Sequence, residues 1–235
     1  MNKLSLSGKY LFQRCFIRAN KGQLRVALNS TPQKGGVVFD VGANYGIFSF
    51  WLALKLRRQG EIHIFEPQDE LNWVYSFLGK LFPKVIFKVN NFGLSNTSKT
   101  MILHRNFIGH GGASLDRLDD KYNEITSKSV TLVSLDDYVA SNSITKIDFI
   151  KIDVEGHEAK LIDGALGSIE KFLPKLLIEM NPSSIDCQNI IEKLENLGYK
   201  SEMLVGKKMI PAIKRNKYPH PVHGPTGSRD FYFSI

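Results

Sequence analysis

The stretch Val37-Val-Phe-Asp-Val-Gly-Ala-Asn-Tyr-Gly46 reads as a buried β-strand that turns directly into a helix. Glycines at such a turn let the backbone approach a ligand closely, and the following helix offers free N–H groups at its N-terminus. Taken alone, the glycine pair fits an ordinary tight turn equally well. A dinucleotide-binding turn would need a further glycine between Gly42 and Gly46, where the sequence has Ala-Asn-Tyr. The turn therefore offers no evident cradle for a pyrophosphate.

Short apolar runs alternate with helical patterns from this strand to Tyr199. This alternation is typical of an α/β fold, in which a mostly parallel sheet is covered by helices on both faces. Two β-rich segments close the chain with no helical pattern between them, so we expect an antiparallel pair there. The expected strands cover residues 37–41, 61–66, 84–89, 147–152, 175–179, 199–205 and 230–234.

Residues 90–133 depart from the alternation. Additional or edge strands are expected at 99–104 and 129–133, and the part between them is polar and rich in glycine. Long loops in a compact domain commonly carry function or specificity. We therefore expect an insert, at about residues 95–133, that contributes to the site.

The net charge of +8 is concentrated at two places in the chain. Residues 1–36 hold seven cations and no acid, and residues 206–229 hold six cations and no acid, so the remainder is mildly acidic. A protein that binds nucleic acid over its whole surface would not show this division, and nucleic acid is not the partner we favour. We expect an N-terminal basic helical segment, residues 1–36, and one domain, residues 37–235, that carries the basic loop 206–229.

Composition argues against several other classes of protein. Cys15 and Cys187 lie far apart, so neither a disulfide scaffold nor a structural zinc site is expected. Basic residues interrupt the N-terminal apolar stretch, which predicts no signal peptide and a cytoplasmic protein. Residues 10–18 could lie on an anionic membrane surface, although a helix that covers the sheet or a dimer contact is the commoner use of such a pattern. The oligomeric state is left open.

The second expected strand ends in Ile64-Phe-Glu-Pro67, which places Glu66 at the carboxyl edge of the sheet next to the first turn. A carboxylate at this position can accept two hydrogen bonds from a ribose diol. Alternatively, Glu66 is an acid at a helix start that interacts with the helix dipole. Together with Asp40 and the glycines, Glu66 indicates an adenosine-containing ligand without a bound pyrophosphate.

A third cluster follows the expected strand 147–152, where Asp153, Glu155 and His157 come in close succession. Several ionisable groups at the end of an apolar strand are costly unless something uses them. Glu179 ends the next strand, and ligands of open α/β sheets bind at this edge. The alternative is that Asp153 caps a helix and Glu155 is merely solvated.

The order of these motifs resembles that of FkbM-type S-adenosylmethionine-dependent methyltransferases over about residues 35–182. The resemblance implies a Rossmann-like class I methyltransferase fold, with a seven-stranded sheet whose last strand is antiparallel. It also implies methyl transfer to a hydroxyl group, usually on a sugar or a secondary metabolite. The motifs that carry it are Phe39-Asp-Val-Gly-Ala-Asn-Tyr-Gly46, Ile64-Phe-Glu-Pro67, Gly93-Leu-Ser95, Val133-Ser-Leu-Asp-Asp-Tyr138, Ile152-Asp-Val-Glu-Gly156 and Leu177-Ile-Glu179.

The resemblance also implies roles for individual residues toward the cofactor S-adenosyl-L-methionine. Glu66 would hold its ribose, and Asn91 and Phe92 would border its adenine. Asp153 and Glu155 match the Asp-x-Glu-Gly signature near the transferred methyl. This chain departs from the common pattern at Asn91, where many class I enzymes have an acid, and at His157, where the family often has a small residue. The methionine part would be held by Asp40, Gly42, Asn44 and Gly46.

Methyl transfer to an alcohol needs a group that removes the hydroxyl proton. The candidates are Asp153, Glu155, His157 and His110, which lies in the glycine-rich loop of the insert. As an alternative, His110 is a solvated loop histidine. Asp153 with Glu179 could instead bind a divalent cation, but we predict no metal.

Two other functions remain as alternatives to a methyltransferase acting on a small-molecule or carbohydrate acceptor. A nicotinamide-dependent oxidoreductase is disfavoured by the missing glycine in the first turn. An RNA methyltransferase is suggested by the basic ends, but amino-methylating enzymes usually carry an Asn/Asp-Pro-Pro-aromatic run where this chain has Asp153-Val-Glu-Gly156. If residues 199–205 run parallel to the other strands, the basic loop 206–229 emerges beside the site, which favours an anionic acceptor.

Overall fold

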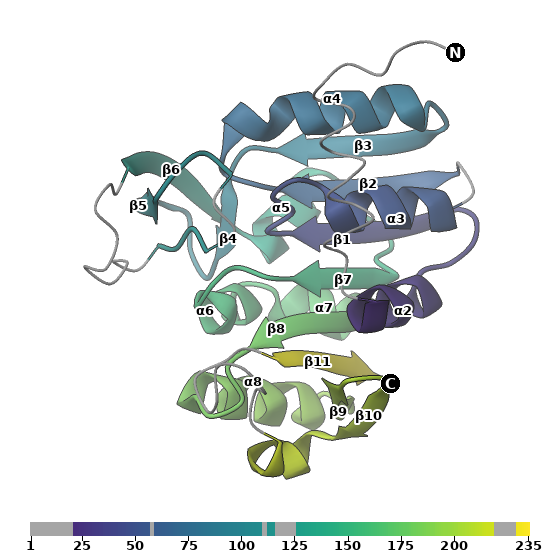
Figure 1. The fold of residues 1–235 in the computed structure, drawn as a ribbon, viewed down its shortest axis with the longest axis vertical. Coiled ribbons are helices and arrows are strands. Elements are labelled where there is room, and N and C mark those ends of the chain that lie inside the picture. Colours follow the sequence, from purple (N-terminus) through teal and green to yellow (C-terminus); the bar gives the residue numbers. More distant parts are fainter. Residues whose placement is uncertain (1–20, 57–58, 110–111, 116–125, 219–228) are drawn as a thin grey trace.

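The computed structural model describes residues 21–56, 59–109, 112–115, 126–218 and 229–235. In these residues, eight strands form one sheet in the order β10-β9-β11-β8-β7-β1-β2-β3 (Figure 1). From β8 to β3 neighbouring strands are parallel, whereas β11 is antiparallel to both of its neighbours. The strands are β1 (Gly36–Val41), β2 (Gly60–Phe65), β3 (Val85–Asn90), β7 (Phe149–Ile152), β8 (Lys175–Met180), β9 (Lys200–Val205), β10 (Lys208–Pro211) and β11 (Arg229–Ser234).

This architecture confirms the α/β fold, the mainly parallel sheet and the antiparallel last strand. The expected number of seven strands is wrong, because β10 adds an eighth at the edge. Gly206, with φ +61°, lets the chain reverse after β9, so that Lys208–Pro211 pairs with the edge that β9 would otherwise leave open. A 3-10 helix, η2 (Ala212–Lys217), follows where no helix was expected.

Helices cover both faces of the main sheet. Because side chains alternate along a strand, Val38 packs against α2, α3 and α4, while the next residue, Phe39, faces the core beneath α5 to α8. The helices are α2 (Lys21–Ser30), α3 (Ile47–Lys55), α4 (Asn72–Leu81), α5 (Leu135–Ser141), α6 (Glu158–Asp163), α7 (Leu166–Phe172) and α8 (Ile185–Asn196); the 3-10 helix η1 (Asp69–Leu71) precedes α4.

The insert forms a second sheet of its own, in the order β4-β6-β5, from β4 (Gly93–Ser95), β5 (Lys99–Arg105) and β6 (Thr126–Ser134). Figure 1 shows this small sheet beyond the carboxyl ends of β1 and β2. The buried Arg105 fastens it to η1 through two hydrogen bonds to Glu70, of 2.7 and 3.2 Å. Lys128 adds ion pairs to Glu70 and Asp69. The insert therefore forms one wall of the space at this edge.

The N-terminal end of the described chain is α2, which lies against β7, β8 and α3. Its Gln23 donates a hydrogen bond of 2.5 Å to Asp230 of β11. Residues 10–18, with their expected membrane or dimer contact, lie outside the described residues. None of the helices in the described ranges has the length and apolar character needed to cross a bilayer.

Candidate active site

The turn after β1 meets the turn after β7 at Gly42. The N–H of Gly42 donates to the carbonyl of Phe65 at 3.0 Å, and its φ is +73°. A Cβ atom on this residue would lie 1.8 Å from the carbonyl oxygen of Asp153, which no side chain could tolerate. Glycine is thus needed here because the turn after β1 and the Asp-x-Glu-Gly turn after β7 touch at this point.

Asn44 and Gly46 shape the rest of the turn. Asn44 has φ 45°, its side-chain oxygen accepts from the N–H of Tyr45 at 2.8 Å, and its carbonyl accepts from Tyr75 of α4 at 2.6 Å. Gly46, with φ +65°, is the N-cap of α3, which begins at Ile47 rather than directly after the strand as expected. The left-handed backbone of these residues delays the helix by one turn.

Glu66 is buried directly after β2 and lines a cleft between the main sheet and the insert. Its Oε2 accepts from the N–H of Asn44 at 2.9 Å, and its Oε1 accepts from the N–H of Gln68 at 3.0 Å. Burial raises the pKa of Glu66, and the two N–H donors counteract this rise. Each oxygen retains acceptor capacity for a ligand hydroxyl.

Gln68 is a site residue that sequence reasoning missed. Its buried side-chain oxygen accepts from Gly109 N–H at 2.9 Å and from Arg105 at 3.1 Å. It therefore joins the insert to the turn that carries Glu66. A polar residue directly after Glu-Pro was the only signal in the sequence, and it did not indicate a long-range contact.

The cleft, here called the first cleft, is open to solvent and spans about 750 Å³ of space at the carboxyl ends of β1, β2 and β7. Much of its wall is apolar and comes from the insert, while its polar groups come from the turns after the strands. The polar side chains are Asn44, Glu66, Gln68, Asp153, Glu155 and His157; the apolar ones include Leu94, Leu103, Ala113, Leu115, Leu132 and Val154.

Asp40 and Gly46 lie outside the residues that line this cleft. Asp40 is fully buried at the end of β1, where its Oδ2 accepts from Ser49 at 2.6 Å. Its Oδ1 has no hydrogen-bond partner among the described residues. Burial raises the pKa of Asp40, against the lowering effects of Lys151 and Ser49. An acid with a spare buried acceptor thus stands beneath the turn.

Asn91 and Phe92, expected beside an adenine, also lie outside the lining of the first cleft. Asn91 exchanges hydrogen bonds of 2.9 Å with Asn72 and donates to the carbonyl of Glu66 at 3.2 Å. Phe92 packs with its ring centroid 5.9 Å from that of Phe65. The following residues, Gly93 and Leu94, line the cleft instead.

A smaller second cleft, of about 550 Å³, opens between the ends of β7 and β8. It shares Asp153 and Glu155 with the first cleft, so the two meet at the Asp-x-Glu signature. Glu155 is exposed on the rim of this cleft, and Glu179 is half-buried. Partial loss of solvent and repulsion from neighbouring acids together raise the pKa of Glu155 to about 7 and that of Glu179 to about 8. The other acids in its wall are Glu158 and Asp186.

Lys151 is a second residue that the sequence analysis did not single out. It is buried in β7, and its ammonium lies 2.8 Å from Asp153 Oδ2. A lysine within the apolar run Phe149–Ile152 was the available signal. Its role becomes visible only when β1 and β8 are seen beside it.

His157 is buried at the start of α6, where its Nε2 shares a hydrogen bond of 2.9 Å with Ser95. It lines the first cleft, together with Asp153 and Glu155. His110, the fourth candidate base, lies outside the described residues. Within the described ranges, no group of three or more His, Cys, Asp or Glu side chains is placed to hold a metal ion.

The described part of the basic loop, residues 206–218, contains the strand β10 and the 3-10 helix η2. The chain leaves β9 at the carboxyl edge as expected, but β10 then returns along β9. The chain then turns through η2, whose Arg215 donates a hydrogen bond of 3.1 Å to the carbonyl of Pro182, just after the carboxyl end of β8. Residues 219–228 lie outside the described residues.

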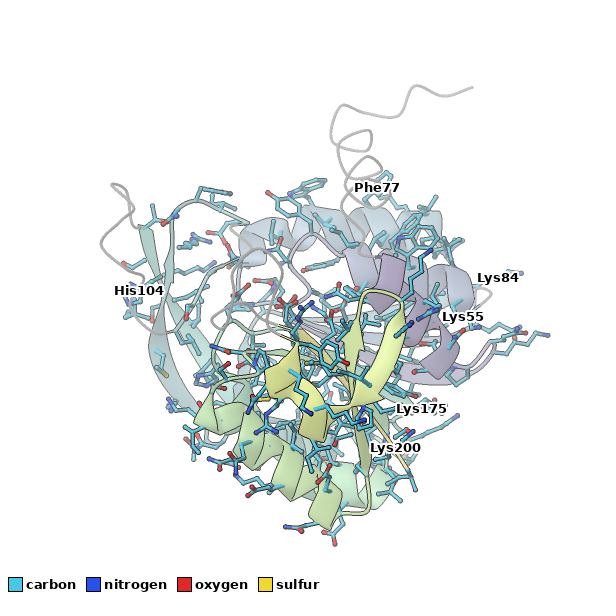
Figure 2. The ribbon with its side chains drawn as sticks, turned by 60° about the horizontal axis from the view of Figure 1, so that its bottom comes forward. Lys55, Phe77, Lys84, His104, Lys175 and Lys200 are labelled. Carbon is cyan, nitrogen blue, oxygen red and sulfur yellow. The ribbon has the colours of Figure 1, made fainter. Side chains whose placement is uncertain are left out.

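Figure 2 shows that Lys55, Lys84, Lys175 and Lys200 gather on the side of the molecule away from His104 and the insert.

The model of the FkbM methyltransferase domain matches residues 40–201. The chain belongs to this family. Hexuronic acid methyltransferase AglP of Haloferax volcanii is 23% identical over 172 residues, which are 72% of this chain and 67% of that protein. Neither the oxidoreductase nor the RNA methyltransferase alternative is favoured by these matches.

Two solved structures show the same fold as this FkbM-family chain. Methyltransferase FkbM from Methylobacillus flagellatus KT has a TM-score of 0.53 at 13% identity, with 97% of this chain and 59% of that chain covered. Fibrillarin from Aeropyrum pernix, solved with natively bound S-adenosyl-L-methionine, has a TM-score of 0.51 at 8% identity, with 91% and 76% covered. The chain thus spans less than two thirds of the first of these structures.

Proposed function

We propose that this FkbM-family protein transfers a methyl group from S-adenosyl-L-methionine to a hydroxyl of a sugar, a glycan or a secondary metabolite. The observation that carries the proposal is Glu66, fixed by two backbone N–H groups in a cleft with an apolar opposite wall. A ribose diol fits the remaining acceptor sites of this carboxylate, and a purine fits the apolar wall. The acids around the cleft suit a cationic ligand.

The residues present can account for each part of the cofactor. Glu66 would bind the ribose hydroxyls, and the backbone around Gly93 and Leu94, which continue from Asn91 and Phe92, would border the adenine. The buried Asp40, with its spare Oδ1, would receive a donor group of the methionine part or organise the turn that does. When bound, the cofactor supplies an electrophilic methyl group on a sulfonium. Gly42, Asn44 and Gly46 would let the methionine part approach the backbone closely.

Glu155 is the general base that we favour. It lines both clefts, and a carboxyl whose pKa is about 7 can take up a hydroxyl proton near neutral pH. Asp153 is paired with Lys151, and His157 is hydrogen-bonded to Ser95, so both are better suited to orient groups than to accept the proton.

The second cleft is where we place the acceptor. Its carboxylates can accept hydrogen bonds from several hydroxyls, which suits a polyol such as a sugar. The name of the relative AglP, a hexuronic acid methyltransferase, supports a sugar acceptor. An anionic group on the acceptor would have to avoid Glu158 and Glu179 and would find Arg215 of the basic loop on the outer side, beside Pro182.

Calorimetric titration with S-adenosylhomocysteine tests the cofactor assignment. We expect Glu66→Gln to weaken binding at least about tenfold, because an amide NH₂ would face a backbone N–H group from which the carboxylate now accepts a hydrogen bond. Glu192→Gln, a change at an exposed position on α8, is the matched control and should bind as the wild type does. Absence of binding by the wild-type protein would overturn the proposed function, and normal binding by Glu66→Gln would overturn the ribose assignment.

A further inference from the structure

Lys151 occupies the centre of the sheet at the edge that carries the site. Its side chain is 6% exposed, and its ammonium lies 2.8 Å from Asp153 Oδ2 and 4.9 Å from the ring centroid of Phe48. In the sheet register it stands opposite Asp40 of β1 and Leu177 of β8. Burial of an ammonium is costly unless acids compensate its charge, so the surrounding groups must account for this lysine.

The surrounding acids come from four adjacent strands or the turns that follow them. Asp40 ends β1, Asp153 follows β7, Glu179 lies on β8, and Asp230 of β11 is paired with Glu179 in the register. The charge of Lys151 acts on all four of these acids. The structure therefore places one buried cation among four carboxyl groups, of which Asp153 lines both clefts and Glu179 lines the second.

Building on the proposed function, we propose that Lys151 is a positioning residue of the methyl transfer. Its ammonium fixes the carboxylate of Asp153 at the wall that both clefts share, and its charge balances the acids around the reacting hydroxyl. A lysine that served only to fill the space beside Phe48 would do neither.

Lys151 also acts on Glu155, the proposed base. The groups that face Glu155 are Asp153 from its own turn, Glu158 of α6 and Lys151 of β7, and Glu179 of β8 is close enough to sense its charge. The two nearer acids raise the pKa of Glu155, whereas Lys151 lowers it. Loss of the lysine charge should therefore raise that pKa further, so that the base becomes deprotonated only at a higher pH.

The test is a titration that needs no acceptor. Carboxyl carbons of 13C-labelled glutamate are followed by NMR from pH 5 to 10 in the full-length chain, with the Glu155 signal assigned from Glu155→Gln. We expect Lys151→Met to raise the pKa of Glu155 by about 0.5–1 unit and Lys151→Arg to leave it within about 0.2 unit of the wild type. A Glu155 pKa in Lys151→Met equal to that of the wild type would overturn the inference.

Lys151→Gln guards against a failure of the methionine variant to fold, because it retains a hydrogen-bond donor for Asp153 and removes only the charge. The same upward shift is expected. S-adenosylhomocysteine binding should weaken about fivefold or more in Lys151→Met and stay within twofold in Lys151→Arg, since Asp153 lines the first cleft. Equal affinity in the wild type, Lys151→Met and Lys151→Arg would overturn the positioning role. A wild type that does not bind S-adenosylhomocysteine would overturn the proposed function. In that case the NMR titration would still measure the effect of the lysine charge on Glu155 independently.

Discussion

The two clefts at the carboxyl edge hold their carboxylates in different ways. In the first cleft, backbone N–H groups at 2.9 and 3.0 Å fix Glu66, and the turn around it is specified by glycines and by Asn44. In the second cleft, Glu155 and Glu179 lie among other acids, and Lys151 provides the opposing charge. Backbone donors do not titrate, whereas clustered acids do.

The comparison indicates a division of labour. In the first cleft the backbone fixes Glu66, so the carboxylate proposed to bind the ribose keeps its position across the neutral pH range, which suits recognition of a constant cofactor. A cleft whose acids have pKa values of about 7 and 8 changes its charge in that range, which suits proton removal from a hydroxyl.

The largest effect should come from the first cleft. Gly42→Ala would place a Cβ atom on the carbonyl oxygen of Asp153, so we expect a loss of about 3 kcal/mol or more in the free energy of unfolding, with loss of S-adenosylhomocysteine binding. Urea denaturation measures the first quantity. Gly35→Ala, at φ +62° with open space around it, is the control and should cost about 1 kcal/mol. Equal losses in the two variants would refute the contact between the turns.

The link between the insert and the first cleft should give the next effect. Gln68→Leu leaves the Gly109 N–H and a guanidinium N–H of Arg105 without their acceptor, which should cost about 2 kcal/mol of stability. Thermal and urea denaturation report this cost. Gln188→Leu, at an exposed position of α8, should change stability by no more than about 0.5 kcal/mol. A neutral effect of Gln68→Leu would mean that the insert closes the cleft without this side chain.

The second cleft predicts a pH-dependent stability. The pKa of Glu179 is about 8 in the folded protein and near 4.5 when unfolded, so the folded state binds the extra proton and loses stability as pH rises from about 4.5 to 8. Glu179→Gln should therefore stabilise the protein by about 1 kcal/mol at pH 8, after allowance for solvent screening, and have little effect at pH 5. Denaturation at the two pH values checks this. The exposed Glu170→Gln on α7 should show no such difference, and stabilisation at pH 5 alone would reverse the predicted sign.

The smallest effect concerns the basic loop, which the sequence analysis linked to an anionic acceptor. Lys214→Gln with Lys217→Gln should raise the KM of a hexuronic acid acceptor about two- to fivefold and leave that of the matching neutral hexose unchanged. Lys84→Gln with Lys175→Gln, on the far side of the molecule in Figure 2, is the charge-matched control. An equal response to both acceptors would show that the loop does not sense acceptor charge.

Local patterns were sufficient for much of the fold. The strand pattern located β1, β2 and β8 to within a residue or two, because each is an apolar run that is visible in sequence. The same reasoning missed β10 and η2, since a short basic run with prolines has no apolar period and pairs only because the edge of β9 is available. Pairing of that kind depends on the neighbour rather than on the segment.

For the site, the sequence by itself determined which acids and glycines end the strands, because chemistry at a strand end stands out against an apolar run. Only the tertiary structure decided how these groups are used. Gly42 is required because the Asp153 carbonyl lies against it, Gln68 matters because Gly109 and Arg105 reach it across the insert, and Lys151 matters because the neighbouring strands β1 and β8 bring acids to it. Such contacts join residues far apart in the chain, and no local pattern of polarity records them.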